Sequence, residues 1–179
     1  MFTLFKFSSP VIIGVSFLLF GCGFIPPSVL GGDENIALET TPVNSISQGQ
    51  NLPIGAKLLI NQEIIELEVA QTPQQQQIGL MYRDFLPPNR GMLFPFNPPQ
   101  TVSFWMKNVS IPLDMIFVSE GIVKHIVTAP PCNDENCPLY NSTVAIDQVI
   151  ELAGNRTEEL GIKVGDKISI EFLEENQQN

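Results

Sequence analysis

A lysine and an aspartate lie within a strongly apolar segment, from Phe104 to Phe117, that also contains the only tryptophan, Trp105. A charged side chain that is buried alone loses much of its hydration energy, so Lys107 and Asp114 must each reach solvent, find a partner or line a cavity. One interpretation is structural: Lys107 extends to solvent and Asp114 ties the turn after Pro112. The functional interpretation is a binding groove formed by Arg83, Trp105, Lys107, Asn108 and Asp114.

Two cysteines, Cys132 and Cys137, flank a four-residue loop between prolines. In an exported protein, thiols this close in sequence commonly form a disulfide. Catalytic dithiols favour two intervening residues at the start of a helix. Here four residues intervene, and the neighbouring prolines disfavour a helix. A zinc site would need acidic ligands, because His125 is the only histidine. We predict a structural disulfide, with a redox pair and a metal site as alternatives.

No familiar catalytic motif brings a nucleophile and a base together in this chain. The sequence therefore favours a non-catalytic binding module without a cofactor. A hydrolase is the first alternative, with Asp114 or Glu151 as the base and Lys107 stabilising negative charge. Binding of cuprous ion is the second, because thioethers suit this soft ion. Its ligands would be Met81, Met92, Met106, Met115 and His125.

Residues 1–21 have the pattern of a secretory signal peptide. Lys6 supplies a basic start, residues 11–20 are almost entirely apolar, and Gly21 precedes Cys22. This apolar stretch is too short to cross a bilayer as a helix. A cysteine directly after a small residue resembles the lipobox of bacterial lipoproteins, in which the cysteine becomes the acylated first residue. We therefore predict an exported protein that is anchored to a membrane through lipid on Cys22, on the periplasmic or outer face of the cell envelope.

The rest of the chain divides into three regions. Residues 22–54, which begin with the acylated cysteine, are rich in proline and glycine and show no periodicity, which predicts a flexible tether. Residues 55–175 have enough apolar residues for one hydrophobic core and are expected to form a single domain. Residues 176–179 form a polar tail.

Within the domain, hydrophobic patterning indicates mostly strands, with a hairpin turn at residues 61–62. Thr72, Pro73 and Gln75 form a capping pattern that predicts a short helix, and residues 155–160 predict a second helical turn. Residues 86–99 are expected to be mainly loop. These features imply a mainly β fold with a minor α+β character: a compact, antiparallel, barrel-like sheet. The expected strands are 56–60, 63–70, 102–107, 113–118, 122–129, 144–152 and 167–173.

The charge of the chain excludes several partners. The net charge is −10, and removal of the signal peptide takes away Lys6 and no acid, which makes it about −11. Nucleic-acid binding needs clustered basic residues that displace counterions from phosphates, so we expect no nucleic-acid partner. Binding to anionic lipid headgroups is disfavoured for the same reason, and the membrane link is expected to be covalent.

Several short motifs follow one another along the domain: Gly79–Arg83, Gly91–Phe94, Phe104–Asn108, Ile111–Phe117, His125–Val127, Pro131-Cys132, Cys137-Pro138 and Leu160–Asp166. Motifs of these types in this order resemble an uncharacterised family known as domain of unknown function 192. The resemblance extends from about residue 58 to 172, with Val109 where threonine is usual and Tyr82 where phenylalanine is common. It implies a compact, mostly β domain that is often exported or lipid-anchored, and no activity is established for it.

Together, these observations predict an envelope lipoprotein with a binding or accessory domain. Its expected partners are the membrane, through the lipid anchor, and an envelope protein or small ligand that the sequence does not specify.

Overall fold

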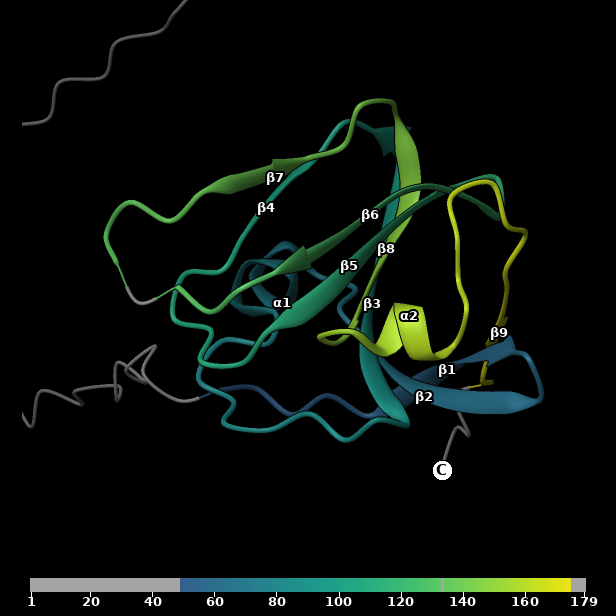
Figure 1. Ribbon diagram of the computed structural model, residues 1–179, viewed down its shortest axis with the longest axis horizontal. Helices are drawn as coiled ribbons and strands as arrows, with labels where there is room; N and C mark the ends of the chain where they lie inside the picture. The colour runs from purple at the N-terminus through teal and green to yellow at the C-terminus, as the bar shows by residue number, and fades with distance from the viewer. Residues whose placement is uncertain (1–48, 133, 175–179) are drawn as a thin grey trace, which may run out of the picture. The chain divides into compact units, whose positions relative to one another are not determined.

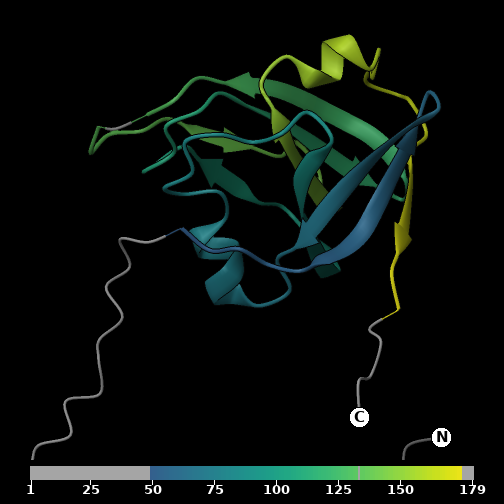
Figure 2. The ribbon, with the colours of Figure 1, turned by 90° about the horizontal axis from the view of Figure 1, so that it is seen from below.

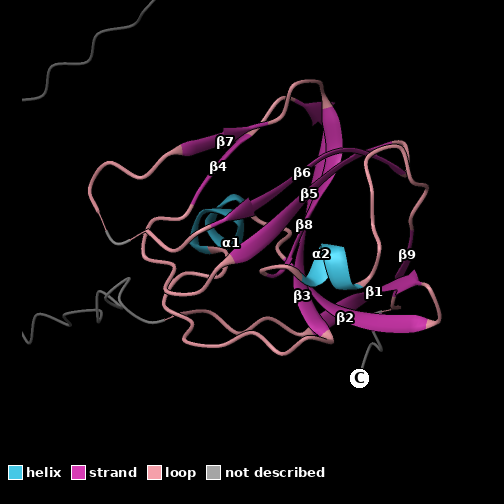
Figure 3. Ribbon diagram, viewed as in Figure 1, coloured by secondary structure: helices cyan, strands magenta, loops and turns pink. Residues whose placement is uncertain are grey.

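The computed structural model describes residues 49–132 and 134–174 (Figure 1). The signal peptide, Cys22, most of the tether and the polar tail lie outside the described residues. The described part is mostly strand with two short helices, which confirms the predicted fold class (Figure 3). None of its helices is long and apolar enough to cross a membrane. The elements are β1 (Ile54–Ile60), β2 (Glu63–Val69), α1 (Pro73–Ile78), β3 (Arg90–Gln100), β4 (Ser103–Trp105), β5 (Leu113–Ser119), β6 (Ile122–Ala129), β7 (Leu139–Asn141), β8 (Ile146–Ala153), α2 (Arg156–Glu159) and β9 (Ser169–Phe172).

Seven strands form one sheet in the order β6-β5-β8-β3-β2-β1-β9. All neighbours are antiparallel except β2 and β3, which are parallel because the chain crosses over through α1 between them. The two edges of the sheet meet without a continuous ladder: Val123 N–H donates to Asp166 O and Ile168 N–H to Gly121 O, both at 2.9 Å. The sheet is therefore barrel-like but not a closed barrel. The two helices lie on opposite sides of the domain (Figure 2).

Two local predictions are confirmed in detail. The turn between β1 and β2 contains Asn61 and Gln62, both with positive φ (46° and 69°), as a tight hairpin requires. At the start of α1, the Thr72 hydroxyl accepts from Gln75 N–H, and the Gln75 side chain accepts from Thr72 N–H at 3.0 Å. This reciprocal capping box fixes where α1 begins, which matters because α1 forms one wall of the site described below.

The prediction of a mainly loop segment at residues 86–99 is wrong, because β3 occupies Arg90–Gln100. Prolines lack an amide hydrogen and normally exclude a central strand. Here β3 pairs with β2 only over residues 90–93, and its register with β8 is interrupted between Pro95 and Gln100. The prolines therefore fall where the ladder needs few donors.

A separate two-stranded sheet, β4 and β7, lies outside the main sheet (Figure 1). The sequence predicted a longer strand at 102–107, whereas β4 has three residues, and β7 was not predicted. Three residues are too short a span to show a periodic pattern.

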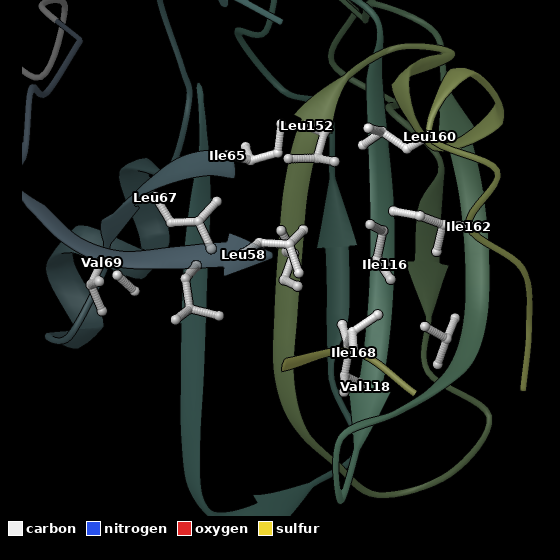
Figure 4. Packing of buried hydrophobic residues seen from close by; sticks show 14 residues of the cluster. Leu58, Ile65, Leu67, Val69, Ile116, Val118, Leu152, Leu160, Ile162 and Ile168 are labelled. Carbon is white, nitrogen blue, oxygen red and sulfur yellow. The ribbon is translucent and has the colours of Figure 1, made fainter. Parts of the chain in front are cut away.

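The core fills both faces of the main sheet. Residues 113–118 of β5 are all buried, so successive side chains enter two different clusters, as expected of a strand covered on both faces. The first cluster lies between β1, β2 and the α2 segment and includes Ile116, Val118 and Leu160 (Figure 4). The second contains Met115 and Phe117. The second cluster packs under α1 and β4.

The predicted disulfide is present. Cys132 and Cys137 are bonded, with their Cα atoms 5.8 Å apart. Isolated β-bridges join Cys132 to Lys107 and Val109. The bond therefore secures the loop between β6 and β7 at the end of the segment that carries Lys107.

Asp114 on β5 is fully buried, and its carboxylate accepts four hydrogen bonds. Three come from the start of α2: Asn155 N–H at 3.0 Å, Thr157 N–H at 2.7 Å and the Thr157 hydroxyl at 2.7 Å. The fourth comes from the Thr128 hydroxyl of β6 at 2.6 Å. Asp114 thus holds α2 and β6 onto β5, which agrees with the structural interpretation of this residue.

We expect Asp114→Asn to lower the free energy of unfolding by about 2–4 kcal/mol, because an amide cannot accept from four donors and loses the charge-assisted bonds. Urea unfolding followed by circular dichroism measures this. The control Asp84→Asn, at an exposed position, should change it by less than about 0.5 kcal/mol. Equal effects of the two substitutions would show that the four hydrogen bonds contribute little.

Candidate functional site

Strand β4 places Trp105 on the surface. Its neighbour Phe104 points inward and makes edge-to-face contacts with Phe94, Phe96 and Phe117, at centroid distances of 5.1, 6.5 and 6.1 Å. Because side chains alternate along a strand, Trp105 faces the other way, and its side chain remains 41% exposed. The exposed tryptophan therefore follows directly after a partly buried phenylalanine that packs against the core.

Three adjoining cavities surround Trp105, between α1 and the segment 100–109, and we call them together the Trp105 groove. They share Gln77 and Trp105 in their linings. The two larger ones have volumes of about 350 and 370 Å³, within the range of roughly 300–1,000 Å³ that is usual for ligand pockets. The first is lined by Gln74, Gln77, Ile78, Met81, Tyr82, Trp105, Lys107 and Asn108, and the second by Pro73, Gln76, Gln77, Phe96 and residues 100–105.

Lys107 and Asn108 stand at one end of the groove. The Lys107 ammonium lies 5.3 Å from the centroid of the Trp105 ring, which gives a cation–π contact. Asn108 has a positive φ of 58°, and its side-chain amide donates to the Tyr82 hydroxyl at 2.8 Å. Tyr82 N–H in turn donates to Asn108 O at 2.8 Å. This reciprocal pair joins the end of the α1 segment to the turn after β4 and keeps the groove walls together.

Glu151 of β8 lines the third, small cavity of about 30 Å³ beneath Trp105. Its side chain is almost fully buried, and desolvation by burial raises its pKa from 4.5 to about 8. The carboxyl group is therefore mostly protonated at neutral pH. Among the described residues that line the Trp105 groove, Lys107 is the only basic one and Glu151 the only acidic one.

The structure brings together three of the five predicted groove residues: Trp105, Lys107 and Asn108. Asp114 is not in the groove, because its buried carboxylate is used by α2 and β6. The sequence pointed to Tyr82 only as a departure from the family pattern and to Glu151 only as an alternative base. Neither could be placed in the groove by spacing, because they come from elements distant in sequence.

Arg83 is not in the groove either, and it lines a different, more polar cavity of about 640 Å³. Its guanidinium donates to both carboxylate oxygens of Glu68, at 2.8 and 2.7 Å, and to Gln50 O. Arg90 pairs with Glu66 in the same lining at 2.9 Å. Because these charges already neutralise one another, the Trp105 groove is the stronger candidate site although its cavities are smaller.

The residues of the alternative cuprous-ion site are part of the packing. Met81, Met92, Met106 and Met115 are all buried in the second core cluster. The His125 ring lies against Phe117 at a centroid distance of 5.6 Å. Within residues 49–132 and 134–174, no group of three or more His, Cys, Asp and Glu side chains is placed to hold a metal ion.

The raised pKa of Glu151 predicts a pH dependence of stability. Between pH 4.5 and about 8, the unfolded chain releases a proton that the folded protein retains, so the free energy of unfolding falls as pH rises through this range. Glu151→Gln removes this loss. At pH 9 the variant should be more stable than the original protein by about 2–4 kcal/mol, and near pH 4 the difference should largely vanish.

Urea unfolding at pH 4, 7 and 9 measures this dependence. Glu171→Gln, at an exposed position of β9, is the matched control and should show no such gain at pH 9. A gain that is equal at all three pH values would contradict the assignment to Glu151 ionisation.

Comparison with known proteins identifies the family of this domain. Residues 56–170 match the family model of domain of unknown function 192, described as "Uncharacterized ACR". No curated protein sequence matches the chain. A crystal structure of a protein of unknown function from Novosphingobium aromaticivorans is 34% identical, with a TM-score of 0.58 over 64% of this chain and 83% of that one.

A second crystal structure, from Sinorhizobium meliloti and described as a "putative transcription regulator", is 31% identical. The match covers 69% of this chain and 98% of that one, with a TM-score of 0.60. Since the family model spans most of the described domain, the chain belongs to the family of domain of unknown function 192.

Proposed function

We propose that this chain is a lipid-anchored protein of the cell envelope whose domain binds a ligand in the Trp105 groove without catalysing a reaction. The observation that carries the proposal is Trp105 itself. A large aromatic side chain is held exposed beside two ligand-sized cavities with a single basic group on its ring. Concave sites lined mainly by apolar side chains with a few polar groups are typical of ligand pockets.

The Sinorhizobium relative is described as a regulator of transcription, but we do not extend that role to this chain. A net charge of −10 repels the phosphate backbone of DNA, and the groove contributes a single basic residue. The signal-like residues 1–21, followed by Cys22, support a location outside the cytoplasm.

One observation favours the alternative of a hydrolase. The pKa of Glu151 is about 8, so this side chain can act as a proton donor at neutral pH, as general acids of hydrolases do. Lys107 would stabilise negative charge, but it lines a different one of the three cavities from Glu151. Asp114 is unsuited to the role of base, because all its hydrogen bonds are structural. Binding without conversion therefore remains the better-supported function.

The lipid anchor is tested with a fatty-acid analogue that carries an alkyne for detection. We expect the protein expressed with its own leader in a bacterial host to be labelled and to sediment with membranes, since the cysteine after the leader is acylated. Cys22→Ser should abolish the labelling and release the protein from membranes. Labelling that persists in Cys22→Ser, or an intact mass without diacylglycerol, would contradict the proposal.

The groove is tested by ligand binding. Because Trp105 is the only tryptophan, its fluorescence reports directly on the groove. Small-molecule fractions from cell envelopes that change this fluorescence should also raise the melting temperature. In Trp105→Ala and Lys107→Ala, the ligand concentration that gives the same rise in melting temperature should be about tenfold higher or more.

The matched controls are Phe85→Ala, which removes an aromatic side chain that is 70% exposed outside the groove, and Lys124→Ala on β6. Both should bind as the original protein does, and the ligand should be recovered unchanged. Loss of binding in all four variants, or conversion of the ligand, would count against the proposed function.

A further inference from the structure

The free edge of β4 borders the Trp105 groove. Strand β4 is antiparallel to β7, with Phe104 opposite Tyr140, and Ser142 N–H donates to Val102 O at 2.9 Å. In an antiparallel pair, alternate residues direct their N–H and C=O groups toward the partner strand. Since Val102 and Phe104 face β7, the backbone groups of Ser103 and Trp105 point to the opposite edge.

Outside the β4–β7 ladder, the main-chain groups of Ser103 and Trp105 make no hydrogen bond to residues 49–132 and 134–174. Unpaired strand edges are templates for the addition of another strand, and each N–H and C=O there gains a hydrogen bond when one is added. The edges of the main sheet are different, because the segment before β9 is bonded to the start of β6. Among the described residues, no strand lies on the outer edge of β7 either, but β7 lines none of the cavities described above.

The cavities lie along this edge in a way that suits an extended chain. Residues 100–105 line one cavity, and Trp105, Lys107 and Asn108 line the other. Helix α1 forms the far wall of both cavities. Side chains of an extended peptide alternate, so those on one face can occupy the cavities on either side of the Trp105 ring while the main chain pairs with β4.

The charges select among such peptides. Lys107 is the only basic residue among the described residues that line the groove, and Glu151 at its floor carries little negative charge at neutral pH because burial raises its pKa. The groove is therefore locally positive although the chain as a whole is strongly negative. A carboxylate on the bound peptide would pair with the Lys107 ammonium at the end of the groove.

We propose that the ligand of the Trp105 groove is an extended polypeptide segment that adds to β4 as a third strand, with an apolar side chain beside Trp105 and a carboxylate on Lys107. This inference rests on the proposed function and names the class of its ligand. Up to four main-chain hydrogen bonds, to Ser103 and Trp105, would supply sequence-independent affinity. The apolar cavity and Lys107 would supply specificity.

The test selects binders from a phage-displayed library of random decapeptides on the purified acylated protein in detergent. We expect enriched peptides to combine aromatic or aliphatic residues with Asp or Glu. Lys107→Ala should lower the affinity of a synthetic enriched peptide about tenfold and abolish the preference for the acidic residue. Lys124→Ala, on β6, should change neither.

Hydrogen exchange of single amides tests the strand geometry. The bound peptide should slow exchange at Ser103 and Trp105 at least tenfold, while Phe104, which already faces β7, should change little. N-methylation of single peptide amides should prevent binding only when the methyl group is on every second residue, because only alternate amides face β4.

The outcomes separate the two proposals. A peptide that quenches Trp105 fluorescence without protecting Ser103 and Trp105 would overturn strand addition and leave the groove intact. If no peptide binds while an envelope metabolite does, the proposal that the ligand is a polypeptide fails, and the proposal that the Trp105 groove binds a ligand is kept. If neither binds, both proposals fail.

Discussion

The position of β4 depends on one side chain that faces the core and is partly buried. Phe104 inserts between Phe94, Phe96 and Phe117 of the core, and its neighbours in β4 contact no strand of the main sheet through a ladder. An isolated two-stranded ladder is only marginally stable, so this aromatic packing is what holds β4 and β7 against the rest of the domain. Because the side chains of a strand alternate, the inward orientation of Phe104 directs Trp105 outward. The outward orientation of Trp105, and with it the candidate site, is therefore a consequence of core packing.

The buried carboxyl groups of Asp114 and Glu151 have opposite roles because their surroundings differ. Asp114 accepts four hydrogen bonds, which replace the water it loses on folding. For Glu151, desolvation by burial is the cause of the pKa shift, and it raises the pKa to about 8. An acid that is buried in this way destabilises the fold at high pH, and acids with such shifted pKa values cluster at functional sites. This contrast favours Glu151, and not Asp114, as a residue of the groove.

The fold was largely predictable because its signals are local. The Asn61-Gln62 turn, the Thr72–Gln75 capping box and the cysteine spacing each act within a few residues. The failures occurred where pairing partners decide the outcome. Proline-rich β3 becomes a strand because its donors are not needed by the neighbouring strands, and β7 exists only because β4 is beside it. Neither condition is visible in a linear sequence.

By itself, the sequence determined that the chain has a mainly β domain, a disulfide between Cys132 and Cys137 and an unusual mixture of charged and aromatic residues around Trp105. Only the tertiary structure decided which of those residues share a surface. It separated Asp114 and Arg83 from the groove and added Tyr82 and Glu151 to it. The physical reason is that hydrophobic periodicity fixes which face of an element is buried, whereas the neighbours of a polar side chain depend on contacts between elements far apart in sequence.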